Sequence, residues 1–267
     1  MLCAYFKCSR NSYYKRIKAK EIELMFESFL LDLVLRERKL QPRIGGKKLY
    51  YLLKEEIHLL DSHFGRDKFL RFLSAHDLTI KKKSYTKTTD SFHRFHKYKN
   101  RLKSARIYSK NQAWAADITY IRTEKGFVYL SLLTDVYSRK IVGWELSESL
   151  SIEGSIRALK KAFRDNGSPK GLIHHSDRGV QYCSTEYVKL LDKHKSIISM
   201  TEENHCYENA LAERVNGILK DEYLLDGTFK DYNSALRACK EAVELYNTRR
   251  PHWALKFKTP QQIHDAV

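Results

Sequence analysis

Three carboxylates in the second half of the chain have the chemistry and spacing to hold divalent metal ions. Asp117 lies in a run of β-branched and aromatic residues, Asp177 follows another apolar run, and Glu213 lies in a stretch with helical periodicity. Magnesium and manganese prefer hard oxygen ligands, and three carboxylates can hold two ions when one carboxylate bridges them. Two ions ~4 Å apart can activate an oxygen nucleophile and stabilise the transition state of phosphodiester cleavage. Each acid alone is more often an ordinary strand-end, turn or helix residue, so the hypothesis depends on the three together.

The elements expected around these acids follow the order of the ribonuclease H-like fold. Residue content predicts strands at 114–123, 127–135 and 140–146, the first two joined by a short hairpin turn. Helices and strands then alternate, at 152–165 (helix), 171–175 (strand), 185–194 (helix), 197–200 (strand), 209–225 (helix) and 232–247 (helix). The fold class is therefore α/β, with a mixed sheet covered on both faces. In this fold the fourth strand pairs beside the first, so Asp117 and Asp177 should meet.

The helix expected at 209–225 has one apolar and one polar side. Its apolar stripe comprises Leu211, Val215, Ile218 and Leu219, and its opposite side comprises Asn209, Glu213, Asn216 and Lys220. Glu213 is therefore expected to face away from the core. Lys220 shares its face two turns later, where a cation could hold a phosphate next to the metals. Solvated side chains are the plain alternative for both residues.

The charge of the chain is concentrated in its first part. The formal net charge is +17, which indicates a polyanionic partner. Residues 1–110 hold 27 Lys and Arg against 11 Asp and Glu, whereas residues 111–267 hold 22 against 21. This distribution is typical of a near-neutral catalytic or structural body that carries a basic appendage.

The basic part contains helices followed by an irregular arm. Apolar spacing predicts three short helices within 20–80, which fit a helix-turn-helix module about as well as a generic helical bundle. Residues 81–110 hold 11 basic residues and a single acid, Asp90, interleaved with aromatics. We expect this arm to contact DNA phosphates, a solvated linker being the alternative. The basic residues proposed for these contacts are Lys81, Lys82, Lys83, Arg94, Lys97, Lys99 and Arg101.

Several other classes of protein are excluded. No apolar stretch approaches the ~20 residues of a membrane span, and the first residues lack the pattern of a secretory signal. The five cysteines form no Cys-x-x-Cys pair, which argues against zinc ribbons and disulfide frameworks and favours a reduced, cytoplasmic setting. We expect the chain to be associated with the nucleoid there. No phosphate-binding Gly-x-x-x-x-Gly-Lys-Ser/Thr segment is present, so ATP is not an expected cofactor.

The acids and their flanking segments resemble a known family. Asp117, Asp177 and Glu213, the last two separated by 35 residues, resemble the Asp-Asp-Glu catalytic core of retroviral integrases and many bacterial transposases. The flanking segments are similar to those of the insertion-sequence transposases of the IS3 family. These segments are Trp114-x-x-Asp-Ile-Thr-Tyr120, Leu133-Thr-Asp-x-Tyr-Ser-Arg139, His175-Ser-Asp-Arg-Gly-x-Gln-Tyr182, Asn209-Ala-x-x-Glu213, Lys220, and Tyr246-Asn-x-x-Arg250-Pro-His252.

The resemblance implies a metal-dependent transposase. Asp117, Asp177 and Glu213 would be both the catalytic residues and the ligands of two Mg²⁺ or Mn²⁺ ions. These would support hydrolysis of one strand by water, which frees a 3′-hydroxyl, and then attack of that hydroxyl on a second phosphodiester, which joins the two strands as the target strand is cut. The implied partner is double-stranded DNA, both element ends and target, bound by a homo-oligomer. Arg178, next to Asp177, is a further candidate DNA contact, or else a surface residue of the loop.

The resemblance also implies an organisation of the chain. Residues 1–19 would join an upstream helix-turn-helix product in a frameshift fusion, and 20–80 would form a helical, helix-turn-helix-like DNA-binding domain. Residues 81–110 would be the basic linker, and 111–267 the ribonuclease H-like integrase core with a C-terminal helix. Two other functions remain open: a ribonuclease H-like nuclease that cuts without joining ends, and a non-catalytic DNA-binding regulator derived from a transposase.

Overall fold

The computed structural model describes residues 9–80, 97–202 and 209–266 of the chain. They fall into two compact units, Met1–Lys81 and Lys82–Val267, which are described separately. None of the helices in these described ranges is long and apolar enough to cross a membrane.

The described residues of the first unit form three helices with a core of their own. Its helices are α2 (Arg10–Leu40), α3 (Gly46–Leu60) and α4 (Arg66–Ala75). Their buried residues, among them Leu33, Leu49 and Phe69, form one apolar cluster. The first helix begins earlier than the apolar spacing predicts, because the Ser9 hydroxyl accepts a hydrogen bond from the backbone N–H of Ser12 and so caps it. Part of the segment expected to be a junction, 10–19, is therefore helical, and 1–8 lies outside the described residues.

The second unit is built on a mixed sheet with the strand order β3-β2-β1-β4-β5. Its strands are β1 (Ala113–Thr123), β2 (Gly126–Asp135), β3 (Ile141–Ser147), β4 (Ile173–Ser176) and β5 (Ile197–Met200). The first three are antiparallel neighbours, while β4 pairs in parallel with β1 and with β5. The predicted ribonuclease H-like arrangement is confirmed. A short strand, β6 (Thr228–Phe229), was not predicted and pairs with the end of β1.

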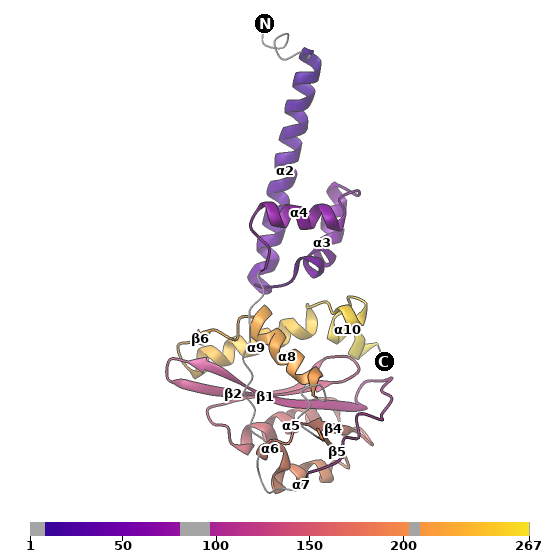
Figure 1. Ribbon diagram of the computed structural model, residues 1–267, viewed down its shortest axis with the longest axis vertical. Coiled ribbons are helices and arrows are strands. Elements are labelled where there is room, and N and C mark those ends of the chain that lie inside the picture. Colours follow the sequence, from indigo (N-terminus) through magenta and orange to yellow (C-terminus); the bar gives the residue numbers. More distant parts are fainter. Residues whose placement is uncertain (1–8, 81–96, 203–208, 267) are drawn as a thin grey trace. The chain divides into compact units, whose positions relative to one another are not determined.

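Helices cover both faces of this sheet (Figure 1). On one face, α5 (Ile152–Asn166), α6 (Val180–Cys183) and α7 (Thr185–Lys193) enclose a core around Trp114. On the other face, α8 (Ala210–Glu222) and α9 (Tyr232–Thr248) enclose a second core that includes Ile121. The alternation of side chains along β1 divides its residues between the two cores.

The C-terminal end of α9 and the residues just after it are held by hydrogen bonds and an ion pair. The Tyr246 hydroxyl donates a hydrogen bond to the carbonyl of Arg139, and the Asn247 amide exchanges two hydrogen bonds with the backbone of Ile141. Arg250 is almost fully buried and makes a bidentate ion pair of 2.7 Å with Glu222 on α8. The polar segment around Pro251 is thus a helix-terminating network, and it continues into a 3₁₀ turn (Trp253–Leu255) and α10 (Pro260–Asp265).

Candidate active site

The strand pairing brings the two aspartates to the same place on the sheet. In the parallel pair of β1 and β4, Ala115 lies opposite His175. Asp117 lies two residues beyond Ala115, and Asp177 lies two residues beyond His175. The two aspartates therefore lie at equivalent positions just past the last residues paired between β1 and β4. Both side chains are half-buried. Asp177 turns back on its own loop, where its Oδ1 accepts a 2.9 Å hydrogen bond from the backbone N–H of Gly179.

The electrostatics of Asp117 connect all three predicted acids. Burial raises the pKa of Asp117 to about 7, and the negative charges of Asp177 and Glu213 contribute to the same upward shift. Hydrogen bonds from the backbone N–H of Ile118, at 2.9 Å, and from the Asn216 amide, at 2.7 Å, oppose it. The three acids are therefore close enough to interact. Glu213 itself is exposed, in the first turn of α8.

Asn209 and Asn216, two residues of the polar side expected for α8, contact β1, and this corrects the expectation for Asn216. Asn216 was placed on a side opposite the core, yet it is buried and donates to Asp117. Asn209, one residue before the helix, is also buried and donates a 3.1 Å hydrogen bond to the carbonyl of Ala116. Since Asn209, Glu213 and Asn216 recur at spacings of four and three, one helical face presents them together. The spacing was visible in the sequence, but not the direction in which that face points.

Lys220 lies at the edge of the same cluster. Its ammonium group is 3.8 Å from the centroid of the Tyr120 ring, and its side chain is half-buried. Burial lowers the pKa of Lys220, while the negative charges of Asp117 and Asp226 raise it. The cation thus interacts with both an exposed aromatic ring and an acid of the site.

The chemistry of these donors fits a divalent metal. Carboxylate oxygens are the preferred ligands of magnesium and manganese. In addition, the buried side-chain oxygen of Asn216 and the hydroxyl of Tyr182 have no hydrogen-bond partner among the described residues. Burial raises the pKa of the Tyr182 hydroxyl, and the charges of Asp117 and Asp177 contribute to the same shift. Yet within the described ranges no three acidic, His or Cys side chains are already gathered tightly enough to hold one ion.

The predicted DNA contacts fall into three groups. Arg178 is half-buried in the loop after Asp177. The exposed arm cations are a second group, comprising Lys97, Lys99 and Arg101. Their backbone is fixed to the second unit, since the N–H groups of Asn100 and Arg101 donate to Glu202 and to the Ser199 hydroxyl at 3.1 and 2.9 Å. The remaining arm candidates, Lys81, Lys82, Lys83 and Arg94, lie outside the described residues.

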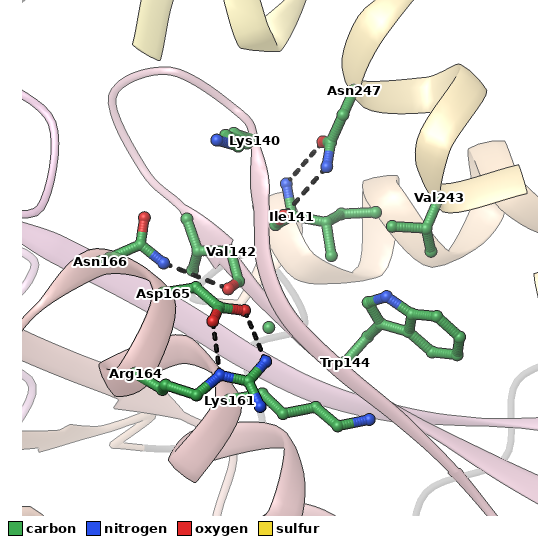
Figure 2. Close-up of a pocket in the computed structure, with 11 residues that line it drawn as sticks. Lys140, Ile141, Val142, Trp144, Lys161, Arg164, Asp165, Asn166, Val243 and Asn247 are labelled. Carbon is green, nitrogen blue, oxygen red and sulfur yellow. Dashed lines mark hydrogen bonds and ion pairs between the residues drawn. The ribbon is translucent and has the colours of Figure 1, made fainter. Parts of the chain in front are cut away.

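A cavity beside β3 is separate from this cluster. It has a volume of about 350 Å³ and lies between β3, α5 and α9 (Figure 2). Two of its cations are already paired, Lys161 with Glu145 and Arg164 with Asp165. The Asn166 amide donates to the carbonyl of Val142, as Asn247 does to that of Ile141. These amides satisfy backbone groups of an edge strand, which is a structural role.

Comparisons with known proteins agree with this architecture. Two protein-family models, both described as "Integrase core domain", match residues 108–206 and 194–260. The 31 kDa protein of insertion element IS600 from Shigella sonnei is 32% identical over 99% of this chain and 97% of its own length. The transposase InsF of insertion sequence IS3A from Escherichia coli is 40% identical over 42% of this chain and 39% of its own length.

Another relative and one solved structure extend these comparisons. The transposase of insertion sequence element IS629 from Shigella sonnei is 36% identical over 58% of this chain and 52% of its own length. A chain in the structure of a simian T-cell lymphotropic virus intasome has the same fold, with a TM-score of 0.51 and 20% identity. The match extends over 82% of this chain and 74% of the intasome chain. The chain belongs to the IS3 family of insertion-sequence transposases, and its second unit carries their integrase core domain.

Proposed function

We propose that this chain cleaves and joins DNA strands during transposition of an insertion sequence, with Asp117, Asp177 and Glu213 as its catalytic residues. The single observation that supports this role is the convergence of the three acids: the pairing of β1 with β4 brings Asp117 and Asp177 together, and the charges of Asp177 and Glu213 add to the effect of burial in raising the pKa of Asp117. Acidic side chains are ordinarily dispersed, because repulsion between them destabilises the fold. A cluster that retains this repulsion is suited to a cationic partner.

The three acids would together hold two Mg²⁺ or Mn²⁺ ions, which supply activation of the nucleophile and stabilisation of the charged transition state. Asn216 would orient the Asp117 carboxylate through its 2.7 Å hydrogen bond, and Asn209 would fix the start of α8 against β1. Lys220 would hold a DNA phosphate beside the acids. No nucleoside triphosphate takes part in this reaction.

Binding of the double-stranded element ends and target would depend on the basic parts of the chain. The side chains of the exposed arm cations extend into solvent from a backbone that is hydrogen-bonded to β5 and the residues after it. This arrangement favours a role in binding phosphates over the role of a free linker. The helical first unit would contribute further DNA contacts. We place these units in a homo-oligomer on DNA, joined to an upstream helix-turn-helix product by frameshift fusion, as the family resemblance implies.

The test replaces Asp117 with Asn, which removes the charge and keeps the size of the side chain. We expect loss of both strand cleavage and strand transfer, measured with labelled oligonucleotides, while DNA binding in EDTA is retained. Asp165→Asn is the matched control, because Asp165 is an exposed acid on α5 that pairs with Arg164. An Asp117→Asn variant with full metal-dependent strand transfer would refute the proposal.

The same assay separates the alternative functions. A ribonuclease H-like nuclease would leave cut fragments and no joined product. A non-catalytic regulator would bind specifically and cut nothing, even as the fusion with the upstream product.

A further inference from the structure

A group of aromatic and basic side chains lies on the surface at the hairpin end of β1 and β2. Tyr120 and Phe127 make an edge-to-face contact with their ring centroids 5.3 Å apart. Lys220 lies 3.8 Å from the Tyr120 ring, and the Arg122 guanidinium lies 5.8 Å from the Phe127 ring. We call these four residues the hairpin platform.

The two aromatic rings of the hairpin platform are exposed to solvent and are not packed into a core of the protein. Tyr120 is 45% exposed and Phe127 is 48% exposed, although each could bury a large apolar area. Neither belongs to the two cores that enclose the sheet. Exposed rings with cations on them are the arrangement by which proteins hold single-stranded nucleic acid, where bases stack on rings and cations contact the phosphates.

The charge of the hairpin platform favours a nucleic acid over a protein partner. It carries two cations, Lys220 and Arg122, and both already lie against rings. Lys220 also connects the hairpin platform to the acid cluster, because it lies on α8 two turns after Glu213 and its ammonium group contacts the Tyr120 ring. A strand held here would therefore lie beside the acid cluster.

We propose that the hairpin platform binds unpaired nucleotides of the DNA strand that enters the acid cluster. Tyr120 lies three residues beyond Asp117 on β1, about 10 Å along the strand at roughly 3.3 Å per residue, and this odd separation places the two side chains on opposite faces of β1. The DNA strand would therefore pass from one to the other beside Lys220, whose ammonium group lies on the Tyr120 ring. The distance along β1 corresponds to about three nucleotides at 3.4 Å per step along one strand of a duplex. A base can stack on a protein ring only when it has left its partner. The inference rests on the proposed function, and it adds that the DNA end is unpaired over these positions.

The first experiment is photo-crosslinking with the full chain in EDTA, so that its readout does not depend on catalysis. The probe is a DNA duplex with an unpaired 3′ end of about three nucleotides, carrying 5-iodouracil at each of these positions in turn. We expect crosslinks at Tyr120 or Phe127, identified by mass spectrometry of the peptides, and none to these rings from a fully paired duplex. Crosslinks confined to other parts of the chain would overturn the inference.

The second experiment measures the affinity of variants for the same two probes by fluorescence anisotropy. Tyr120→Leu and Phe127→Leu should each weaken binding of the unpaired probe about tenfold and leave the paired duplex unchanged. Tyr120→Phe, which keeps the ring, should bind nearly as the wild type does. Trp253→Leu is the matched control, because Trp253 is an exposed ring outside the hairpin platform, in the 3₁₀ turn that follows α9. Equal affinities of all variants for both probes would also overturn the inference, and would leave a protein partner as the occupant.

These outcomes are separable from a failure of the proposed function. If Tyr120→Leu loses neither crosslink nor affinity while strand transfer is normal, only the inference fails. If the wild-type chain gives the crosslinks but never joins DNA strands with Mg²⁺ or Mn²⁺, only the proposed function fails.

Discussion

Replacement of Asn216 with Ala should weaken metal binding at the acid cluster without affecting DNA binding. The Asn216 amide donates a 2.7 Å hydrogen bond to the Asp117 carboxylate; Asn216 is buried and Asp117 is half-buried. A hydrogen bond to a charged group is worth about 1.5–3 kcal/mol. Loss of a side chain that orients a metal ligand typically lowers metal affinity by about 10- to 100-fold. We therefore expect the half-saturating Mg²⁺ concentration for strand transfer to rise by about this factor.

The assay is a Mg²⁺ titration of strand transfer on labelled oligonucleotides, with DNA binding in EDTA measured in parallel. The mechanism also predicts that high Mg²⁺ restores most of the rate, because Asn216 orients a ligand and does not itself touch the reacting atoms. Asn166→Ala is the matched control, since the Asn166 amide donates to the backbone carbonyls of Val142 and Ala162, beside the cavity at β3, and not to an acid. If both variants have the same metal dependence as the wild type, Asn216 does not orient Asp117 for metal binding.

Three further predictions concern other parts of the molecule. Arg250→Ala should cost about 3–5 kcal/mol in urea unfolding, because it leaves Glu222 without its buried partner, whereas Arg164→Ala, at an exposed pair, should leave the stability nearly unchanged. Burial lowers the pKa of His174 from 6.5 to about 3, so the unfolded chain takes up the proton first and stability should fall as the pH drops from 6.5 towards 3. In His174→Gln, urea unfolding at several pH values should show a slope smaller by about 1.4 kcal/mol per pH unit; an unchanged slope would contradict the assignment. Neutralising the three exposed arm cations with Gln should reduce the slope of log affinity against log salt by up to about 0.9 per cation, and an unchanged slope would show that they contact no phosphates.

The order of elements in the second unit was predictable because its strands and helices differ clearly in residue pattern. The β-branched run of β1 and the apolar spacing of α5 each lead to one assignment, and the structure agrees with both to within a few residues. The two-residue strand β6 could not be predicted, because so short a segment carries no periodicity. Its pairing with β1 depends on where the chain returns after α8. The start of α2 was placed too late for another reason: residues 10–19 lack buried apolar positions, and a capped run of helix-forming residues continues without them.

Local patterns fixed the position of each acid along the chain but not its surroundings. The pairing of β1 with β4 was predicted from the order of elements, and it brings Asp117 and Asp177 together. Asn216 was recognised as a member of the polar face of α8, but its burial depends on how that helix packs against β1. The same holds for Tyr182, whose apolar ring gave no sign that its hydroxyl would lie near two aspartates. Periodicity gives the spacing of side chains on an element, whereas tertiary packing decides what they meet.

The near neutrality of residues 111–267 conceals an uneven distribution of charge that bears on function. Some acids of this part are neutralised locally by ion pairs, as Glu145 is by Arg157 and Lys161. Asp117 differs, because burial and two neighbouring acids disfavour its charged form while neutral donors from Asn216 and Ile118 oppose them. An arrangement that strains electrostatics in this way is rarely retained for stability alone. The buried oxygen atoms of Asn216 and Tyr182, which lack partners in the described part of the chain, lie around the same acid. Repulsion between acids and unsatisfied hydrogen-bonding groups thus coincide at Asp117. A bound cation would relieve the repulsion, and its ligands or water molecules would satisfy the oxygen atoms of Asn216 and Tyr182.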